Sequence, residues 1–153
     1  MKENENLPKF KTRHTEKGVL IFDALRKKYI PLTPEEEVRQ HFVHYLVNVL
    51  KYPAGLMGNE VAIVQNGIRR RCDTVVFDHS GNPVMIVEYK APSVSLTQQV
   101  FDQIYRYNMV LQVKYLVVTN GLSLYCCRMN YKENKYEFIS ELPSHEKLSE
   151  LNP

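Results

Sequence analysis

Hydrophobic residues recur at helical spacing in two segments of the chain. In residues 32–52, Thr33 is a favourable N-cap, Pro34 suits the first helical position, and Glu36 falls at the capping-box position. The apolar positions that follow are Val38, Phe42, Tyr45, Leu46 and Val49. In residues 95–113 the apolar positions on one face are Val100, Ile104, Tyr107 and Leu111. Both patterns predict an amphipathic helix.

Runs typical of β-strands lie between and after these helices. Three of them, "EVAIVQ", "RCDTVVFD" and "NPVMIVEYK", separate the helices, and the turn-like "HSGN" joins the last two. An apolar strand, "KYLVVTNG", follows the second helix, and "LSLYCCRMN" and "KYEFISEL" have the pattern of a final hairpin. Near the start, "GVLIFDAL" and "KKYIPL" suggest short strands or a hairpin. This order predicts an α/β (α+β) fold with a mixed central β-sheet flanked by helices.

The length of 153 residues suits one domain. We expect a flexible, charged arm over residues 1–15, a globular domain over 16–142, and a polar tail over 143–153 with room for one helical turn. No apolar run approaches the roughly 18 residues of a membrane span, so no membrane partner is expected. Three cysteines, two of them adjacent, with no C-x-x-C pattern favour a reduced, cytoplasmic protein. The net charge of +3 permits a nucleic-acid partner without requiring one.

The strand "NPVMIVEYK" ends in charged residues, which are costly to bury without compensation. Glu88 and Lys90 share one face of this strand, and Tyr89 takes the other. A two-residue turn at Ser80-Gly81 sets Asp73 opposite Glu88, and a turn shifted by one residue sets it opposite Lys90. Both registers place Asp73, Glu88 and Lys90 on one face, whereas an odd-length turn needs a bulge to do so.

Two neighbouring carboxylates repel each other, and a divalent cation between them removes that repulsion. Mg²⁺ typically takes one or two protein carboxylates, waters and phosphate oxygens. Asp73 and Glu88 fit this need, with the Tyr89 backbone carbonyl as a third ligand and Lys90 to orient water and offset phosphate charge. This is the chemistry of phosphodiester hydrolysis. The alternative is a structural ion network, since a second E-x-K, at Glu133–Lys135, has the pattern of a solvated turn.

Residues on the two helices and one arginine run could complete such a site. Gln103 and Tyr107 share a helix face, either at the site or as a helix edge with one tyrosine in the core. On the first helix Glu35 shares the apolar face, Glu36 caps the helix and Glu37 points to solvent. Glu35 either lies near a metal or lysine or stabilises the helix dipole. The run Arg69, Arg70 and Arg71 is the strongest basic cluster, and it either binds phosphates or forms a solvated strand end.

Five segments in order, "LTPEEEVRQHFVHYL", "RRRCDTVVFD", "VMIVEYKAP", "DQIYRYN" and "KYLVVTNG", resemble the N-terminal nuclease domain of type I restriction enzyme R (HsdR-type) subunits. That domain belongs to the PD-(D/E)xK nuclease superfamily. The resemblance covers roughly residues 29–127 and implies a restriction-endonuclease-like fold for residues 16–142. One departure is Cys72, which stands where the family has proline and which affects shape rather than chemistry.

The resemblance implies roles for individual residues. Asp73 matches the acidic residue of the first hairpin strand, and Glu88 and Lys90 match the E-x-K of the second. Gln103 and Tyr107 match the Q-x-x-x-Y motif, which is thought to support the site and contact DNA. The acidic residue of the first helix falls at Glu35 or Glu36, and the facing argument favours Glu35.

Three functions compete on this basis. The first is a Mg²⁺- or Mn²⁺-dependent DNA endonuclease of the restriction-modification type. The second is a non-catalytic DNA-binding or assembly module with a nuclease fold, and the third is a structural α/β protein that binds no metal. DNA is the expected partner, together with other restriction-modification subunits or a translocase. The chain has no G-x-x-x-x-G-K-[ST] phosphate loop, so we expect a stand-alone relative or a fragment that cannot translocate DNA alone.

Overall fold

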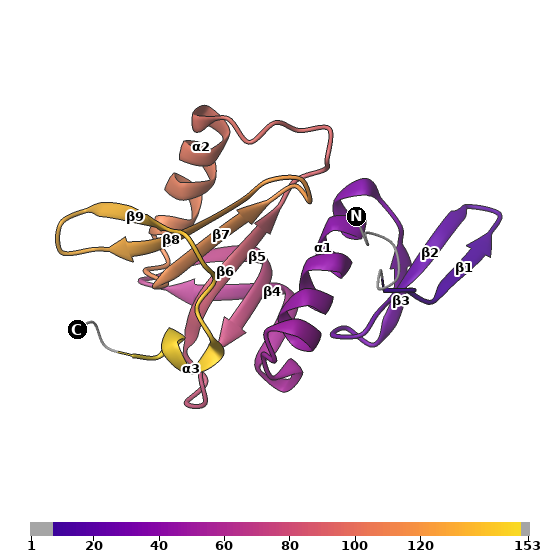
Figure 1. Cartoon of the computed structure of the whole chain (residues 1–153), viewed down its shortest axis with the longest axis horizontal. Coiled ribbons are helices and arrows are strands. Elements are labelled where there is room, and N and C mark those ends of the chain that lie inside the picture. Colours follow the sequence, from indigo (N-terminus) through magenta and orange to yellow (C-terminus); the bar gives the residue numbers. More distant parts are fainter. Residues whose placement is uncertain (1–7, 151–153) are drawn as a thin grey trace.

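A six-stranded mixed sheet forms the centre of the molecule, which a computed structural model describes over residues 8–150 (Figure 1). The strands are β4 (Met57–Gln65), β5 (Ile68–Phe77), β6 (Pro83–Tyr89), β7 (Tyr115–Thr119), β8 (Leu124–Asn130) and β9 (Lys135–Ile139), adjacent in that order. Only β6 and β7 pair in parallel, because the helix α2 (Gln98–Met109) connects them. The predicted mixed sheet flanked by helices is confirmed.

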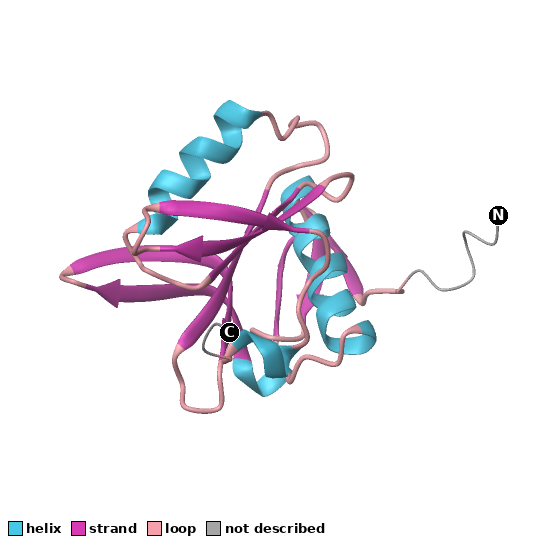
Figure 2. Cartoon of the chain, turned by 60° about the vertical axis from the view of Figure 1, so that its left-hand side comes forward, coloured by secondary structure: helices cyan, strands magenta, loops and turns pink. Residues whose placement is uncertain are grey.

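The two long helices cover opposite faces of this sheet (Figure 2). Helix α1 (Pro34–His44) begins at the predicted cap, where the Glu36 N–H donates to Thr33 Oγ1 at 3.1 Å. It packs Val38 and Phe42, with Leu46 just beyond its end, against the face of the sheet that carries Val76, Val87, Tyr89 and Val117. Helix α2 packs Phe101, with Leu111 just beyond its end, against the face that carries Val75, Ile86, Leu116 and Val118. The central strands β6 and β7 are thus buried on both faces, which accounts for their continuous apolar runs.

The apolar stripe predicted for the first helix is wrong at its end. Tyr45 and Val49 are 40% and 60% exposed. The reason is a π-helical turn over Tyr45–Val49, in which the Leu50 N–H donates to Tyr45 O at 3.1 Å. The wider turn changes the angular position of every residue after His44, so the α-helical spacing no longer identifies the buried face. A short 3₁₀ turn, Ala54–Leu56, then leads into β4.

A second, three-stranded antiparallel sheet lies beside α1 and contains β1 (Thr12–Thr15), β2 (Gly18–Asp23) and β3 (Lys28–Pro31). The predicted hairpin is therefore confirmed. The predicted flexible arm over residues 1–15 is wrong for Thr12–Thr15, which pair with β2. Residues 1–7 lie outside the described residues.

The polar tail predicted over residues 143–153 packs against the core as far as it is described. Its helical turn is α3 (His145–Leu148), and Leu148 is fully buried in the α1 face of the core. His145 Nε2 lies 2.9 Å from Phe77 O, and the Tyr52 hydroxyl donates to Pro143 O. No helix in the described part combines the length and apolar content that a membrane crossing requires.

Candidate active site

The β5–β6 hairpin decides which side chains meet at the end of β6. Its turn holds three residues, His79–Gly81, because the Asp78 N–H donates to Asn82 O at 2.9 Å and Gly81 adopts φ +83°. The predicted two-residue turn is therefore wrong. A three-residue turn alone would place Asp73 and Glu88 on opposite faces of the sheet.

A bulge between Val76 and Phe77 corrects the register, so that Thr74 pairs with Val87. One residue further along, this register sets Asp73 opposite Glu88, as the first of the two predicted registers requires. One of the two predicted registers is therefore correct although the predicted turn is one residue too short. The bulge restores the register that the longer turn would otherwise shift.

Asp73 and Glu88 line a cavity of about 380 Å³ between the middle of β5, the end of β6, the N-terminus of α1 and one face of α2. The cavity contains every residue predicted for the site except Arg69 and Arg70. Its lining residues are Glu35, Arg71, Asp73, Glu88, Tyr89, Lys90, Val100, Gln103, Ile104, Tyr107 and Asn108. Segments that are up to 73 residues apart in sequence thus meet at one point.

Glu88 is the least compensated charged group in this cavity. Its Oε1 atom is buried and has no hydrogen-bond partner among the described residues. Asp73, by contrast, accepts the Tyr89 N–H at 3.0 Å through Oδ2. Burial, and after it the neighbouring Asp73 carboxylate, raises the pKa of Glu88 to about 10. At neutral pH the pair therefore holds a proton or needs a cation.

Glu35, in the first turn of α1, and Lys90, just beyond β6, also line this cavity. Burial, followed by the Asp73 charge, raises the pKa of Glu35, while Lys90 and Arg39 oppose that rise. The Lys90 N–H donates to Thr119 O at 3.0 Å, which fixes the backbone just beyond β6. Glu36 instead points away from the cavity and pairs with arginines. The structure therefore places Glu35, the residue that the facing argument favours, at the cavity.

Helix α2 presents Gln103 and Tyr107 to the cavity, as their four-residue spacing predicts. The Tyr107 side chain is not a core residue, because it is 46% exposed and the Arg70 guanidinium lies 4.8 Å from its ring centroid. Asn108 is buried beside it and its Oδ1 atom has no partner among the described residues. Sequence reasoning missed Asn108, although a polar residue four positions after Ile104 on an apolar face was a usable signal.

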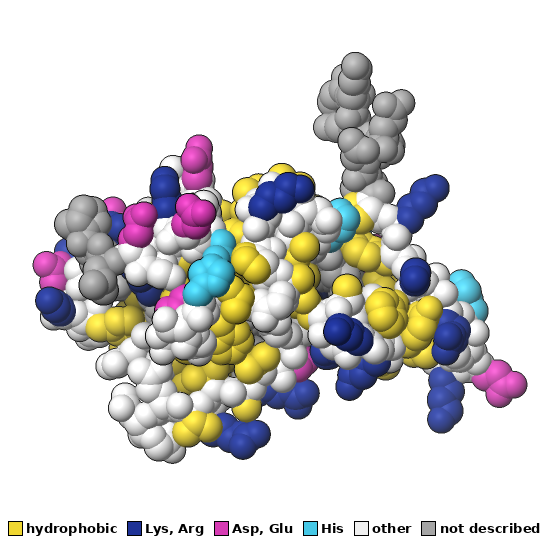
Figure 3. All heavy atoms as spheres, turned by 90° about the horizontal axis from the view of Figure 1, so that it is seen from below, with side chains coloured by type: hydrophobic (Ala, Val, Ile, Leu, Met, Phe, Trp, Pro, Cys, Tyr) yellow, Lys and Arg dark blue, Asp and Glu magenta, His cyan; other side chains and the backbone are white. Residues whose placement is uncertain are grey.

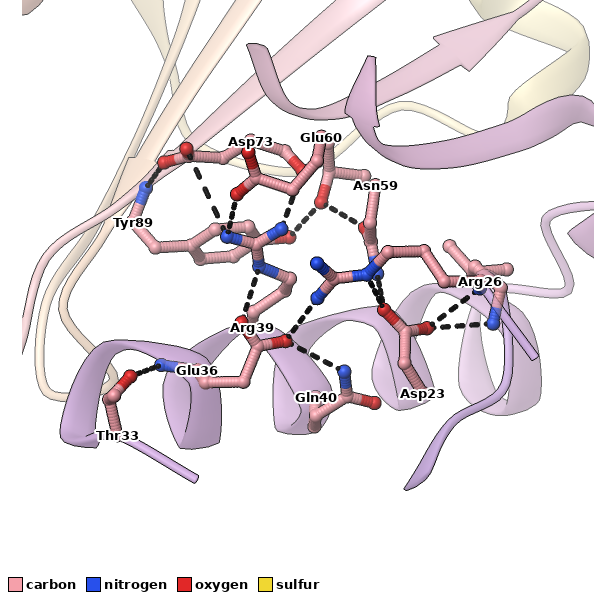
Figure 4. Close-up of polar contacts among 12 residues, drawn as sticks. Asp23, Arg26, Thr33, Glu36, Arg39, Gln40, Asn59, Glu60, Asp73 and Tyr89 are labelled. Carbon is pink, nitrogen blue, oxygen red and sulfur yellow. Dashed lines mark hydrogen bonds and ion pairs between the residues drawn. The ribbon is translucent and has the colours of Figure 1, made fainter. Parts of the chain in front are cut away.

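Arg39 is a second residue that sequence reasoning missed, and it supports the backbone of the site (Figure 4). It is 3% exposed, and its Nη1 donates to the backbone carbonyl of Asp73 at 3.1 Å. Its Nη2 donates to Glu60 Oε1 at 2.6 Å and lies 4.0 Å from Asp73 Oδ1. The guanidinium also lies 5.6 Å from the Tyr89 ring centroid. One side chain thus joins α1 to β4, β5 and β6 while leaving the Asp73 carboxylate without a close ion pair.

A chain of buried polar contacts extends from Arg39 to the small sheet (Figure 4). Glu36 Oε2 lies 3.5 Å from Arg39 Nε, and Glu36 Oε1 accepts Arg26 Nη2 at 2.8 Å. Arg26 also pairs with Asp23 at the end of β2, and Asn59 Nδ2 donates to Asp23 Oδ2 at 3.0 Å. The small sheet is therefore fixed to α1 and β4 by charged hydrogen bonds.

The three consecutive arginines do not act as one cluster. Arg71 lines the cavity, and its Nε lies 2.7 Å from Glu60 Oε2 with the side chain 71% exposed. Arg70 lies over Tyr107, outside the cavity lining. Arg69 is exposed at the strand end. Only Arg71 therefore lies where a phosphate in the cavity would be.

A divalent metal fits the donors of this cavity. Within residues 8–150, no three His, Cys, Asp or Glu side chains form a metal-binding group. The candidate ligands are accordingly Asp73, Glu88 and a backbone carbonyl, for which Tyr89 is positioned in the lining. Two carboxylates are a usual protein contribution to Mg²⁺, and the unpaired Glu88 Oε1 is an oxygen donor with no other partner in the described part of the chain.

A larger cavity, of about 630 Å³, lies between α1 and the segments after β7 and β9. Its lining includes Phe42, Tyr45, Leu122 and Leu124, and none of Asp73, Glu88 and Lys90. Volume alone therefore does not identify the site; the convergence of unpaired polar groups does.

Comparisons with known proteins point to one family. A family model described as "Type I restriction enzyme R protein N terminus (HSDR_N)" matches residues 34–143. No curated protein matches the chain. A fragment of a proposed HsdR subunit of a type I restriction enzyme from Vibrio vulnificus YJ016 is similar in structure, with a TM-score of 0.52 and 18% identity over 76% of this chain and 24% of that one. A proposed nuclease belonging to DUF820 from Anabaena variabilis ATCC 29413 has a TM-score of 0.48 and 14% identity over 92% of this chain and 86% of that one. The chain thus shares its fold with the HsdR fragment and spans about a quarter of its length.

Proposed function

The chain belongs to the family of type I restriction enzyme R protein N termini, and we propose that it is a Mg²⁺- or Mn²⁺-dependent DNA endonuclease domain of a restriction-modification system. The observation that carries the proposal is the buried Glu88 oxygen, which has no partner among the described residues and lies beside the Asp73 carboxylate. A protein that needed these groups only for stability would have paired them, because an uncompensated buried carboxylate is costly.

The residues of the cavity divide the chemistry between them. Asp73, Glu88 and the Tyr89 carbonyl would hold the metal, which when bound supplies Lewis-acid polarisation of a phosphate oxygen and a more acidic water. Lys90 orients the attacking water and offsets charge on the phosphate, and Glu35 positions water on the α1 side. Gln103 and Tyr107 contact the DNA beside the scissile phosphate, and Arg71 binds a neighbouring phosphate.

The test is nicking of supercoiled plasmid DNA in Mg²⁺ or Mn²⁺ by wild type and by Lys90→Ala. We expect the variant to lose activity by about 10²-fold or more, the usual cost of removing a group that stabilises transition-state charge. Its Mn²⁺ affinity, measured by calorimetry, should stay close to that of wild type because Lys90 is not a ligand.

The chain offers a matched control in its second E-x-K. Lys135 lies 2.5 Å from Glu133 in the exposed β8–β9 turn, with both side chains more than half exposed. Lys135→Ala should therefore keep full activity. Mn²⁺ binding without nicking by wild type would favour the non-catalytic DNA-binding or assembly module instead, and absence of Mn²⁺ binding would overturn the metal site.

A further inference from the structure

Positive charge is concentrated at the start of the chain, outside the region that the family model matches. Residues 1–33 contain eight Lys or Arg and four Asp or Glu, a formal charge of +4, whereas residues 34–153 contain twelve and thirteen, a formal charge of −1. The expectation that Arg69–Arg71 is the main basic cluster is therefore incomplete. The small sheet, rather than the nuclease-like unit, makes the chain basic.

The cations of residues 8–33 lie on or beside the small sheet, and the exposed ones form no ion pair with any residue of the described range 8–150. The exposed ones are Lys9, Lys11, Arg13, Lys17, Lys27 and Lys28. Glu16 is the one exposed carboxylate of residues 8–33, since Asp23 is buried and paired with Arg26. Figure 3 shows Lys and Arg side chains gathered over this end of the molecule, at the right of the view, with few acidic side chains among them. Such a surface is complementary to a polyanion.

The dimensions of the sheet suit a nucleic-acid backbone. Lys17 lies in the β1–β2 turn, and Lys27 and Lys28 lie at the β2–β3 turn, so they occupy opposite ends of the six-residue strand β2. Six residues of strand span about 20 Å. Duplex DNA presents on the order of 12 phosphate charges over that length. Between the two ends, Arg13 lies 4.1 Å from the Tyr29 ring centroid, which holds its charge at the surface.

The sheet is also rigidly joined to the candidate active site. Arg26 bonds to Glu36, one residue from Glu35 in the cavity lining, and Asp23 accepts a bond from Asn59 on β4. Both bonds are made to a carboxylate and are buried or partly buried, so the basic surface keeps a fixed position relative to Asp73 and Glu88.

We propose that the small sheet, β1–β3, is a second DNA-binding surface, which contacts the phosphate backbone of the duplex whose scissile bond lies in the cavity. The proposal rests on DNA being the substrate, as proposed above. The proposal attributes DNA affinity to the sheet and phosphodiester hydrolysis to the cavity. It therefore predicts that a variant can lose one of these properties and keep the other.

The test compares two variants that carry the same number and kind of changes. The first combines Lys11→Gln, just before β1, with Lys17→Gln, Lys27→Asn and Lys28→Gln at the two ends of β2. The control combines Lys51→Asn, Lys132→Gln, Lys135→Gln and Lys147→Gln on the rest of the surface. All eight lysines are exposed, and Asn is used at Lys27 and Lys51 because both have positive φ. Each variant lowers the formal charge from +3 to −1.

The measurement is the affinity for duplex DNA against salt concentration, in EDTA so that cleavage plays no part. We expect the slope of log affinity against log salt to fall in magnitude by about 0.9 for each phosphate that the protein no longer neutralises, up to about 3.6 in the small-sheet variant, and by less than about 0.9 in the control. Equal changes of the salt slope in both variants, or no change in either, would overturn the proposal. It would also be overturned if the small-sheet variant kept its DNA affinity but lost binding to phosphatidylglycerol vesicles. A chain that binds DNA through this sheet but never cleaves would refute the proposed nuclease activity and leave this surface in place.

Discussion

Two groups of buried or half-buried carboxylates lie close to Arg39, and they are compensated in opposite ways. On one side of Arg39, Glu36 and Glu60 pair with arginines. Burial acts to raise the pKa of Glu60, but the hydrogen bond and charge of Arg39 outweigh it and lower that pKa. On the other side Glu88 has an oxygen with no partner among the described residues, and burial with the Asp73 charge raises its pKa to about 10. The same chain therefore pairs its buried carboxylates in one place and leaves one unpaired in another.

This difference distinguishes carboxylates that stabilise the fold from a carboxylate that is available for function. The interpretation of Asp73, Glu88 and Lys90 as a structural ion network describes the arginine-paired group well, where each carboxylate has a cation within hydrogen-bonding distance. It does not describe Glu88, because burial and the Asp73 charge raise its pKa by more than Asn108 and Arg39 lower it. Perturbed pKa values of this kind, in a cavity, are typical of functional sites.

The largest expected effect comes from breaking the paired group. Arg39→Met removes the most deeply buried cation of this group. Glu36 and Glu60 then keep only the less buried Arg26 and Arg71, and the Asp73 carbonyl loses its donor. We expect the free energy of unfolding in urea to fall by about 3–5 kcal/mol, as for other buried pairs that lose one partner.

Arg128→Gln is the control, because Arg128 pairs with Glu137 at 3.0 Å on the exposed β8–β9 hairpin. It should cost no more than about 1 kcal/mol, and equal losses in the two variants would show that burial of the Arg39 network is not decisive.

The opposite result is expected for the unpaired group. A carboxyl whose pKa is raised on folding keeps a proton that the unfolded chain releases above pH 4.5, so it lowers stability increasingly as the pH rises from there towards 10. Glu88→Gln removes that penalty with little change of shape. We expect a gain of more than about 1.4 kcal/mol at pH 8, the worth of one pKa unit, and a smaller gain at pH 5.

Urea unfolding at the two pH values measures this gain, and thermal scans with Mn²⁺ complete the comparison. Mn²⁺ should raise the melting temperature of wild type and leave that of Glu88→Gln unchanged, since the variant lacks a ligand. A pH-independent difference between wild type and Glu88→Gln would contradict the raised pKa.

The sequence was sufficient for the parts of the site that depend on periodicity. The alternation of β6 places Glu88 and Lys90 on one face, and the four-residue spacing of Gln103 and Tyr107 places both at the cavity. The alternation also limited the pairing of β5 with β6 to two registers if Asp73 and Glu88 share a face. It did not give the three-residue turn or the position of the bulge between Val76 and Phe77.

The sequence was insufficient where a residue's role depends on tertiary contacts. Arg39 stands between Val38 and Gln40 with no local pattern to mark it, and its partners Glu60 and Asp73 come from strands 21 and 34 residues away. Glu36 satisfied a local rule as a capping-box residue, which concealed its pairing with Arg26. The same holds for the tail, because the burial of Leu148 depends on a surface that the rest of the fold creates.

The smallest expected effect lies at the border of the two groups, where Arg71 pairs with the second oxygen of Glu60. Because the Arg71 side chain is 71% exposed, Arg71→Ser should change the free energy of unfolding by less than about 1 kcal/mol. Arg39 continues to compensate Glu60 from the buried side. The loss should appear in DNA binding instead, as a fall of about 0.9 in the magnitude of the salt slope, the value of one neutralised phosphate.

Arg69→Ser is the matched control: it removes the same charge two positions away, outside the cavity lining, and should leave the slope nearer that of wild type. If Arg71→Ser destabilised the protein as strongly as Arg39→Met, Arg71 would contribute to the stability of the fold. It could then not leave Glu60 to bind a DNA phosphate.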